Sequence, residues 1–204
     1  MKKIIAILIL ITPLISLAQD TERVIRKGLA AGKGTLAMGM PTDYEGTNMY
    51  VSGNLQYYVE NNISLRGEIW FFLGSDGDKN LFKQNSTLFT NFNYHITTKN
   101  NIDPYIGIGP GFSWTQLKEP ENPIIMIVVD NNRPTSSYSA SLSPVASITA
   151  GINYYTKWAH LFIEAKYVHG IHLSDVPVVS LNELRIAFGF GWNINFKNKK
   201  NLKK

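Results

Sequence analysis

The sequence has 204 residues, of which 44% are hydrophobic and 17% charged, and it contains no cysteine. That length suits one domain of ordinary size, the low charge excludes a disordered chain, and the lack of cysteine excludes disulfide scaffolds and zinc ribbons. The formal net charge is +5, but seven of the 20 basic residues are lysines at the two ends of the chain. The rest of the chain is slightly acidic, so no nucleic-acid-binding face is expected.

The chain begins with the pattern of a secretory signal peptide at residues 1–18. Two lysines precede an apolar run over 4–17, and Ser16-Leu17-Ala18 offers a small-residue cleavage site. The run is shorter than the roughly 20 residues that a membrane-spanning helix needs, which favours removal over retention as an anchor. We therefore predict signal-dependent export, with residues 19–33 forming a periplasmic segment.

Period-two alternation follows, and it predicts β-strands because successive side chains of a strand point to opposite faces. Alternating segments occur at 34–41, 49–59, 63–73, 84–97, 102–116, 139–154, 159–170 and 183–196. The last segment is the clearest, because its even-numbered residues from 184 to 196 are all apolar and its odd-numbered residues are small or polar. The sequence thus predicts eight strands.

The predicted connections alternate in length. Turn-forming residues make three short links, at 60–62, 98–101 and 156–158. The longer links are 42–48, 74–83, 117–137 and 171–180. Short turns at one end, long loops at the other and an even number of strands are typical of outer-membrane barrels. We predict an all-β fold: an eight-stranded antiparallel up-and-down transmembrane β-barrel over 34–196, with both termini in the periplasm.

Alternation alone does not separate a membrane barrel from a soluble one, whose apolar face would line a ligand pocket. Small residues such as Gly107, Gly109 and Gly111 crowd the polar face, and they suit the narrow interior of an eight-stranded barrel. The same face carries opposite charges two positions apart. We predict that these residues form an interior charge network: Arg66 with Glu68, Glu164 with Lys166, and Glu183 with Arg185.

Aromatic residues gather near the predicted strand ends, as expected for a girdle at the membrane interface. They are Tyr57, Tyr58, Trp70, Phe71, Phe72, Trp114, Tyr154, Tyr155, Trp158, Trp192 and Phe196. Together with the small and charged residues on the polar face, they favour a membrane barrel. A soluble periplasmic or secreted β-barrel that binds an apolar ligand is kept as an alternative.

Over 28–196 the chain resembles the small Gram-negative outer-membrane barrels of the OmpA/OmpX-like type. The likeness is carried by residues 104–112, by residues 162–167 and by the last predicted strand. The resemblance implies a place in the cell outer membrane, in contact with its lipid and lipopolysaccharide. Proteins of this family serve adhesion, structural anchoring and lipid chemistry.

The last predicted strand also resembles the assembly signal that the barrel assembly machinery recognises. Gly191, Ile194 and Phe196 occupy three of its four places, and Gly189 stands where a polar residue is expected. The chain continues beyond the signal as a basic segment over 197–204, for which we predict a solvated periplasmic tail.

His172 and Ser174, with Glu183 as the carboxylate, are the candidates for catalysis. In a hydrolytic triad a histidine activates the serine and a carboxylate orients the histidine. Some eight-stranded barrels are lipid A deacylases built on such a set, but they carry asparagine after the serine, where this chain has Asp175. We therefore expect no catalysis, no cofactor and no metal. A lipid A-modifying hydrolase is the alternative.

The long link 117–137 contains a β-prone apolar run, Ile124-Ile125-Met126-Ile127-Val128-Val129. An exposed run of this kind can add a strand to another protein, which would make it a surface loop for an extracellular partner. Alternatively, the fifth and sixth strands extend beyond the membrane and pair with each other, or the run packs over the mouth of the barrel. The expected role is structural or surface interaction, similar to that of an adhesin.

Overall fold

The computed structural model describes residues 27–76, 81–96, 101–118, 139–173 and 179–195. Several predictions fall outside these described residues: the signal peptide 1–18, the apolar run 124–129, Ser174, Phe196 and the tail 197–204. Within the described part of the chain, no helix is long and apolar enough to cross a membrane.

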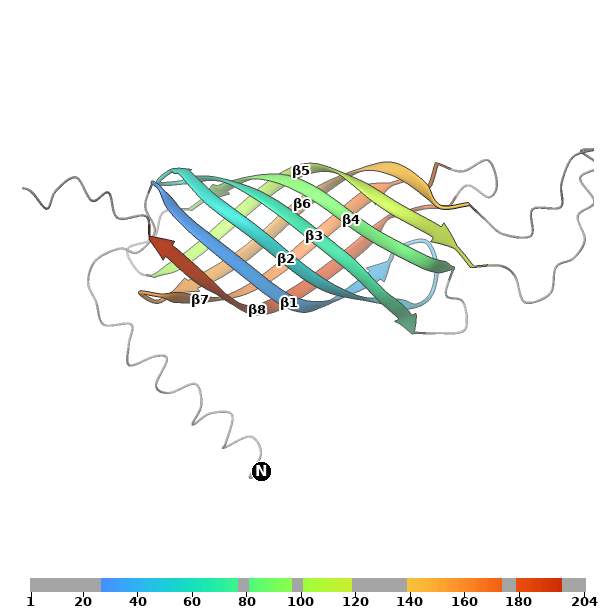
Figure 1. Ribbon diagram of the computed structural model, residues 1–204, viewed down its shortest axis with the longest axis horizontal. Helices are drawn as coiled ribbons and strands as arrows, with labels where there is room; N and C mark the ends of the chain where they lie inside the picture. The colour runs from blue at the N-terminus through green and yellow to red at the C-terminus, as the bar shows by residue number, and fades with distance from the viewer. Residues whose placement is uncertain (1–26, 77–80, 97–100, 119–138, 174–178, 196–204) are drawn as a thin grey trace, which may run out of the picture.

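Eight antiparallel strands form one closed barrel (Figure 1). Each strand pairs with its neighbours in sequence, and β1 pairs with β8 to complete the wall. The strands are β1 (Leu29–Pro41), β2 (Thr47–Glu60), β3 (Ile63–Asp76), β4 (Phe82–His95), β5 (Ile102–Leu117), β6 (Ser141–Tyr155), β7 (Ala159–Gly170) and β8 (Glu183–Asn195). The predicted fold class and strand count are confirmed.

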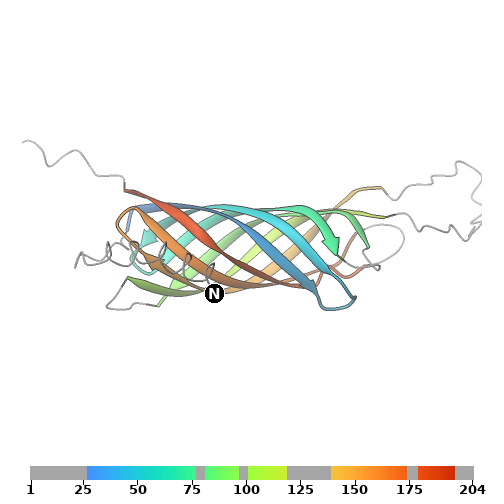
Figure 2. The ribbon, with the colours of Figure 1, turned by 90° about the horizontal axis from the view of Figure 1, so that it is seen from below.

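The two ends of the barrel differ in their connections. At one end, which we call the turn end, β2–β3, β4–β5 and β6–β7 are joined by short links, and both β1 starts and β8 ends there (Figures 1 and 2). The opposite end, the loop end, carries the remaining connections, of which 118–140 is the longest. The predicted distribution of links between the two ends is confirmed, but the loop-end links 42–46 and 77–81 are shorter than predicted and no longer than the turn-end link 96–101.

The first strand begins earlier than the sequence predicts. Residues 29–33 were assigned to the periplasmic segment 19–33, but they pair with β2 on one side and β8 on the other, so that boundary is wrong. The small residues Ala30, Ala31 and Gly32 hide the alternation there, because they barely differ in hydropathy from one face to the other.

Large apolar side chains point outwards on all eight strands, and the charged side chains of the strands are mostly buried in the lumen beside an apolar cluster that includes Phe82, Phe89 and Phe162. Leu55, Ile148 and Phe188 are 72%, 64% and 69% exposed, whereas Arg66 and Lys166 are fully buried. A soluble barrel requires the opposite arrangement, with apolar groups inside and polar groups in water. The soluble-barrel alternative therefore does not fit this fold.

Four residues of the predicted girdle face the lumen instead. Tyr58, Trp70 and Tyr155 are buried, and Phe72 packs partly buried against the apolar cluster inside the barrel, so the girdle prediction is wrong for them. Each of these residues is next to another aromatic residue in the sequence. Because successive side chains of a strand point to opposite faces, only one residue of such a pair can face outwards. Tyr57 and Phe71, the outward members of two of these pairs, are exposed.

Glycines in β5 allow lumen side chains to lie against the wall. A Cβ atom on Gly109 would come within 2.6 Å of the Thr90 carbonyl oxygen and would also meet the side chain of Asn91. Such a contact with backbone cannot be relieved by a rotamer change. The lumen is therefore too narrow for a methyl group at this position. By contrast, a Cβ on Gly67 of β3 would meet no atom within 4 Å.

We predict that Gly109→Ala destabilises the barrel by about 1–3 kcal/mol, the usual cost of overpacking a filled interior. Gly67→Ala is the matched control and should change the free energy of unfolding by less than about 0.5 kcal/mol. Urea titration of the refolded protein in detergent, followed by the heat-dependent gel mobility shift, measures both. Equal midpoints for the two variants would contradict the tight packing at Gly109.

Candidate functional site

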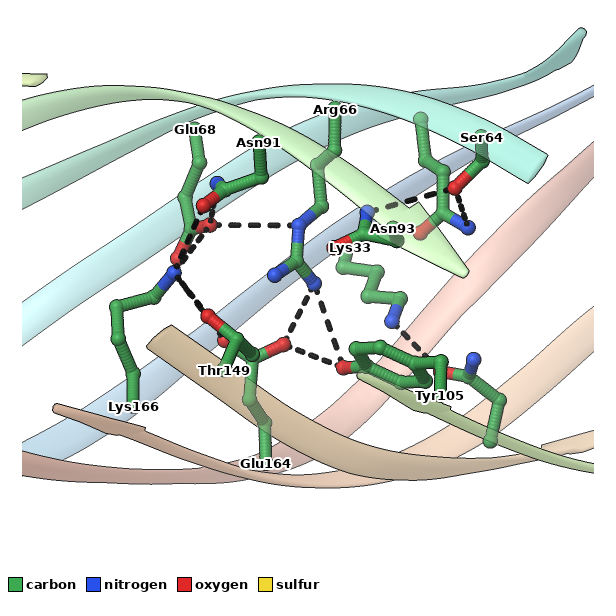
Figure 3. Close-up of polar contacts among 12 residues, drawn as sticks. Lys33, Ser64, Arg66, Glu68, Asn91, Asn93, Tyr105, Thr149, Glu164 and Lys166 are labelled. Atoms are coloured by element: carbon green, nitrogen blue, oxygen red, sulfur yellow. Dashed lines mark hydrogen bonds and ion pairs between the residues drawn. The ribbon is translucent and has the colours of Figure 1, made fainter. Parts of the chain in front are cut away.

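Four charged residues meet at the centre of the lumen (Figure 3). Arg66 and Glu68 project from β3, and Glu164 and Lys166 project from β7, on the opposite side of the barrel. Arg66 Nη1 donates to Glu164 Oε2 at 2.5 Å, and Arg66 Nε lies 3.3 Å from Glu68 Oε2. Lys166 Nζ lies 3.2 Å from the same Glu68 oxygen. Two cations thus balance two carboxylates, as buried charges require.

Neutral groups surround this central network. The Tyr105 hydroxyl donates to Glu164, and Asn91 Nδ2 donates to Glu68 Oε2 at 2.8 Å. Both donors come from strands that lie between the two charged strands, β5 and β4. The carboxylates are therefore held by hydrogen bonds as well as by charge, which makes the cluster a rigid filling of the barrel.

A further lumen cation was missed by the sequence analysis because its residue was assigned to the segment 19–33. Lys33 of β1 is buried, its Nζ donates to Asn153 Oδ1 at 2.6 Å, and the same atom lies 4.6 Å from the ring centre of Phe162. Lys33 lies between Gly32 and Gly34 in the first part of β1. If this part of the chain is recognised as a strand, the alternation of its side chains predicts that Lys33 points into the lumen.

The third predicted charge pair forms a separate network towards the loop end. Arg185 Nε donates to Glu183 Oε2 at 2.6 Å, and the Tyr50 hydroxyl donates to the same oxygen at 2.8 Å. The Arg185 guanidinium lies 4.4 Å from the ring centre of Tyr50 and 5.2 Å from that of Trp70. The six predicted residues are all buried, but they form two groups rather than one.

At the turn end, a hydrogen-bonded cluster involves Ser64, His95 and Asp103, none of which the sequence analysis singled out. Ser64 Oγ lies 2.8 Å from His95 Nε2, and His95 Nδ1 lies 2.9 Å from Asp103 Oδ2. The Tyr58 hydroxyl donates to Asp103 at 2.9 Å and lies 2.8 Å from the Tyr155 hydroxyl. We call these five residues the turn-end plug.

The turn-end plug has the connectivity of a serine–histidine–carboxylate triad, which is the arrangement that activates a nucleophile. All five side chains are nevertheless buried, with 1% exposure at most. The polar groups of the cluster bond to one another, and none of the five side chains is open to solvent in the structure.

Two of the candidate hydrolase residues, His172 and Glu183, lie at the loop end. His172 is buried, and its Nδ1 lies 2.5 Å from Thr115 Oγ1 and 3.0 Å from Ser141 Oγ. Glu183 bonds to Arg185 and Tyr50 in the network described above. Ser174 lies outside the described residues, so the hydrolase alternative stays a hypothesis.

Of the residues assigned to the assembly signal, Gly191 and Ile194 are described. Ile194 points outwards and is exposed, as an outer-face signal requires. Gly191 points into the lumen, where a Cβ atom would come within 2.7 Å of His160 Nε2. The glycine thus leaves room for a buried histidine. Phe196 lies outside the described residues.

The fold is that of the small outer-membrane barrels. The structure is similar to the outer membrane protein OprG from Pseudomonas aeruginosa, with a TM-score of 0.60 and 12% identity over 85% of this chain and 100% of OprG. It is also similar to Neisserial surface protein A (TM-score 0.57, 12% identity, 82% of this chain and 96% of that one). The N-terminal β-barrel domain of P. aeruginosa OprF gives a TM-score of 0.51 and 16% identity over 83% of this chain and 99% of the domain.

No protein-family model and no curated protein matches the sequence. At sequence identities this low, the likeness shows the fold alone. The predicted resemblance is therefore confirmed for the barrel architecture, and no role of a single residue follows from it.

We predict that Arg66→Gln destabilises the barrel by about 3–5 kcal/mol, because it leaves Glu68 and Glu164 with one buried cation between them. Lys27→Gln is the control: Lys27 Nζ lies 2.6 Å from Glu60 Oε1, but both side chains are more than half exposed. Removing such a pair should cost less than about 1 kcal/mol. Denaturant midpoints in detergent compare the two, and similar losses would contradict a stabilising lumen network.

Burial lowers the pKa of His172 below its ordinary value of 6.5. The unfolded chain therefore takes up a proton at His172 at a higher pH than the folded chain, so stability should fall as the pH drops below about 6.5. We predict that His172→Gln reduces this loss between about pH 7 and pH 5. His169→Gln, at an exposed histidine of the same strand region, is the control. Parallel stability curves for wild type and His172→Gln would argue against the effect.

Proposed function

We propose that this chain is an outer-membrane β-barrel with a sealed lumen and a structural or surface-interaction role. The observation that carries the proposal is the inversion of the usual polarity: apolar side chains face outwards on all eight strands, and charged side chains are paired inside. In a bilayer the outward groups would contact lipid, and closure of β1 on β8 gives every strand a neighbour on both sides.

The filled lumen supports a role other than diffusion. An eight-stranded barrel is just wide enough for its own side chains. Here the central charge network, the Glu183–Arg185 network and the turn-end plug occupy successive levels of the lumen. A solute would have to break buried ion pairs at more than one of these levels, which is costly.

If the lumen is closed, partners must meet the outer surface. Lipid and lipopolysaccharide would contact the apolar wall, and the barrel assembly machinery would recognise the last strand, where Ile194 is exposed. The loop end would face the outside of the cell after export by the signal peptide 1–18. Its longest connection carries the run 124–129, which we propose as the adhesin-like contact for an extracellular protein.

The first experiment separates location from transport. Cells expressing the full chain are fractionated, and the protein is run on gels with and without boiling; we expect recovery in the outer membrane with a heat-dependent mobility shift. Reconstituted in planar bilayers, the protein should give no stable porin-like conductance. Recovery in the soluble periplasm would overturn the membrane proposal, and a steady conductance would overturn the sealed lumen.

The hydrolase alternative has its own assay. Lipid A from cells that express the wild type, His172→Ala or Ser174→Ala is analysed by mass spectrometry for its acyl chains. An interaction protein should leave the three profiles identical. Loss of acyl chains that depends on both residues would replace the proposed role with catalysis.

A further inference from the structure

One seam of the barrel wall is shorter than the strands that form it. The pairing of β3 with β4 extends from Ile63 opposite Tyr94 to Trp70 opposite Thr87. Beyond that level, towards the loop end, β3 continues to Asp76 and pairs with β2 alone. The first residues of β4 pair with β5 alone.

A side chain joins the two strands where the backbone pairing has ended. The Phe72 backbone N–H donates to Ser86 Oγ at 3.1 Å, and Gln84 Nε2 donates to the same oxygen at 2.7 Å. The Ser86 hydroxyl therefore links β3 to β4 at a level where the backbone ladder between them has ended.

An apolar hollow of about 290 Å³ lies beside this seam. Its lining comes from four consecutive strands: Ile69 of β3, Ser86, Thr87 and Leu88 of β4, Phe112 and Trp114 of β5, and Leu142 of β6. The large members Leu88, Phe112 and Trp114 are outward-facing and exposed. The hollow is thus continuous with the apolar outer face, and its occupant must come from the medium that contacts that face.

Two lysines lie on the same strand pair, nearer the loop end. Lys83 lies at a register shift between β4 and β5. Phe82 pairs with Leu117 and Gln84 pairs with Gln116, so Lys83 is the extra residue of β4 between these two pairs. A bulge of this kind re-aims side chains, and Lys83 is exposed. Lys118 directly follows β5 and is also exposed.

The spacing of these lysines from the hollow fits a lipid molecule. At roughly 3.4 Å per residue, Lys83 lies about 10 Å along the strand from Ser86, and Lys118 about 14 Å from Trp114. Long lysine side chains also bend along an apolar surface towards a headgroup. A phosphate at the level of the lysines would therefore place the acyl chains beside the hollow.

We propose that the hollow binds an acyl chain of an anionic phospholipid-like molecule from the surrounding leaflet, with its phosphate on Lys83 and Lys118. This inference rests on the proposed function, because the hollow meets lipid only when the outer face of the barrel lies in a bilayer. The apolar lining selects the chain, and the two cations select the charge of the headgroup.

The test uses tryptophan quenching by lipids with brominated chains. A Trp158→Phe/Trp192→Phe protein keeps Trp114 as its outward tryptophan, and a Trp114→Phe/Trp158→Phe protein keeps Trp192; the buried Trp70 is common to both. Each is placed in phosphatidylcholine vesicles that contain a minor fraction of brominated phosphatidylglycerol or of brominated phosphatidylcholine. The anionic lipid should quench Trp114 several-fold more strongly than the neutral one.

Lys83→Gln/Lys118→Gln, added to each protein, supplies the decisive comparison. It should abolish the preference at Trp114 and leave the quenching of Trp192 unchanged. Equal quenching of Trp114 by the two lipids in a chain that inserts and shows the heat-dependent shift would overturn the lipid site alone. Failure of the chain to insert, with neither lipid quenching either tryptophan, would overturn the proposed function as well.

A second measurement uses the protein without tryptophan changes. Wild type in nanodiscs of mixed phosphatidylglycerol and phosphatidylcholine is released in a mass spectrometer, and the lipids that stay bound are counted. Retention should favour phosphatidylglycerol several-fold, and Lys83→Gln/Lys118→Gln should remove that excess. Retention in the bulk ratio would contradict the site even if the tryptophan variants do not fold.

Discussion

The contact of Arg66 with Glu164 spans the lumen and joins opposite walls of the barrel. Cations in the lumen are not solvated by bulk water. Each must therefore contact a carboxylate or the face of an aromatic ring. The structure satisfies this constraint at successive levels of the lumen. Near the turn end, Lys33 donates to Asn153 and lies over the Phe162 ring. The central network pairs two cations with two carboxylates, and Arg185 pairs with Glu183 nearer the loop end. Because these groups occupy the lumen, the same constraint on charge supports the proposal that the lumen is closed.

The narrowness of the lumen explains where the small residues lie. Gly109 and Gly191 leave room for Asn91 and His160, which bond in turn to charged or polar partners. A wider barrel would need no such glycines but would also leave its interior charges apart. The glycines in the wall and the buried ion pairs therefore depend on the same narrow lumen. If the wall moved outwards, the ion pairs would separate and the glycines would no longer be needed.

Sequence alternation predicts which face a residue occupies but not which lumen residues meet. The alternation shows that Arg66 and Glu164 face the lumen and are buried. Their contact across β3 and β7 depends on the stagger of the strands around the closed barrel, and no local sequence pattern contains that information. The turn-end plug was missed for the same reason, since Ser64, His95 and Asp103 come from three strands. Alternation also fails to predict which face a residue occupies where consecutive residues have similar side chains, as in the small residues of β1 and in the aromatic pairs. The low identities with OprG and Neisserial surface protein A fit this view, because the architecture depends on parity and closure more than on individual side chains.

The proposed sealed lumen shifts the search for function to the outer surface and the loop end. The seam between β3 and β4 is notable there, because it has the fewest paired residues of the eight strand pairs in the wall. Unpaired backbone is costly in lipid, so a seam of this kind persists only if side chains or a bound molecule compensate. Ser86 provides part of that compensation from within the chain. An acyl chain against Leu88 and Trp114 would exclude water from the same place, which would make the surrounding lipid a structural component of the wall.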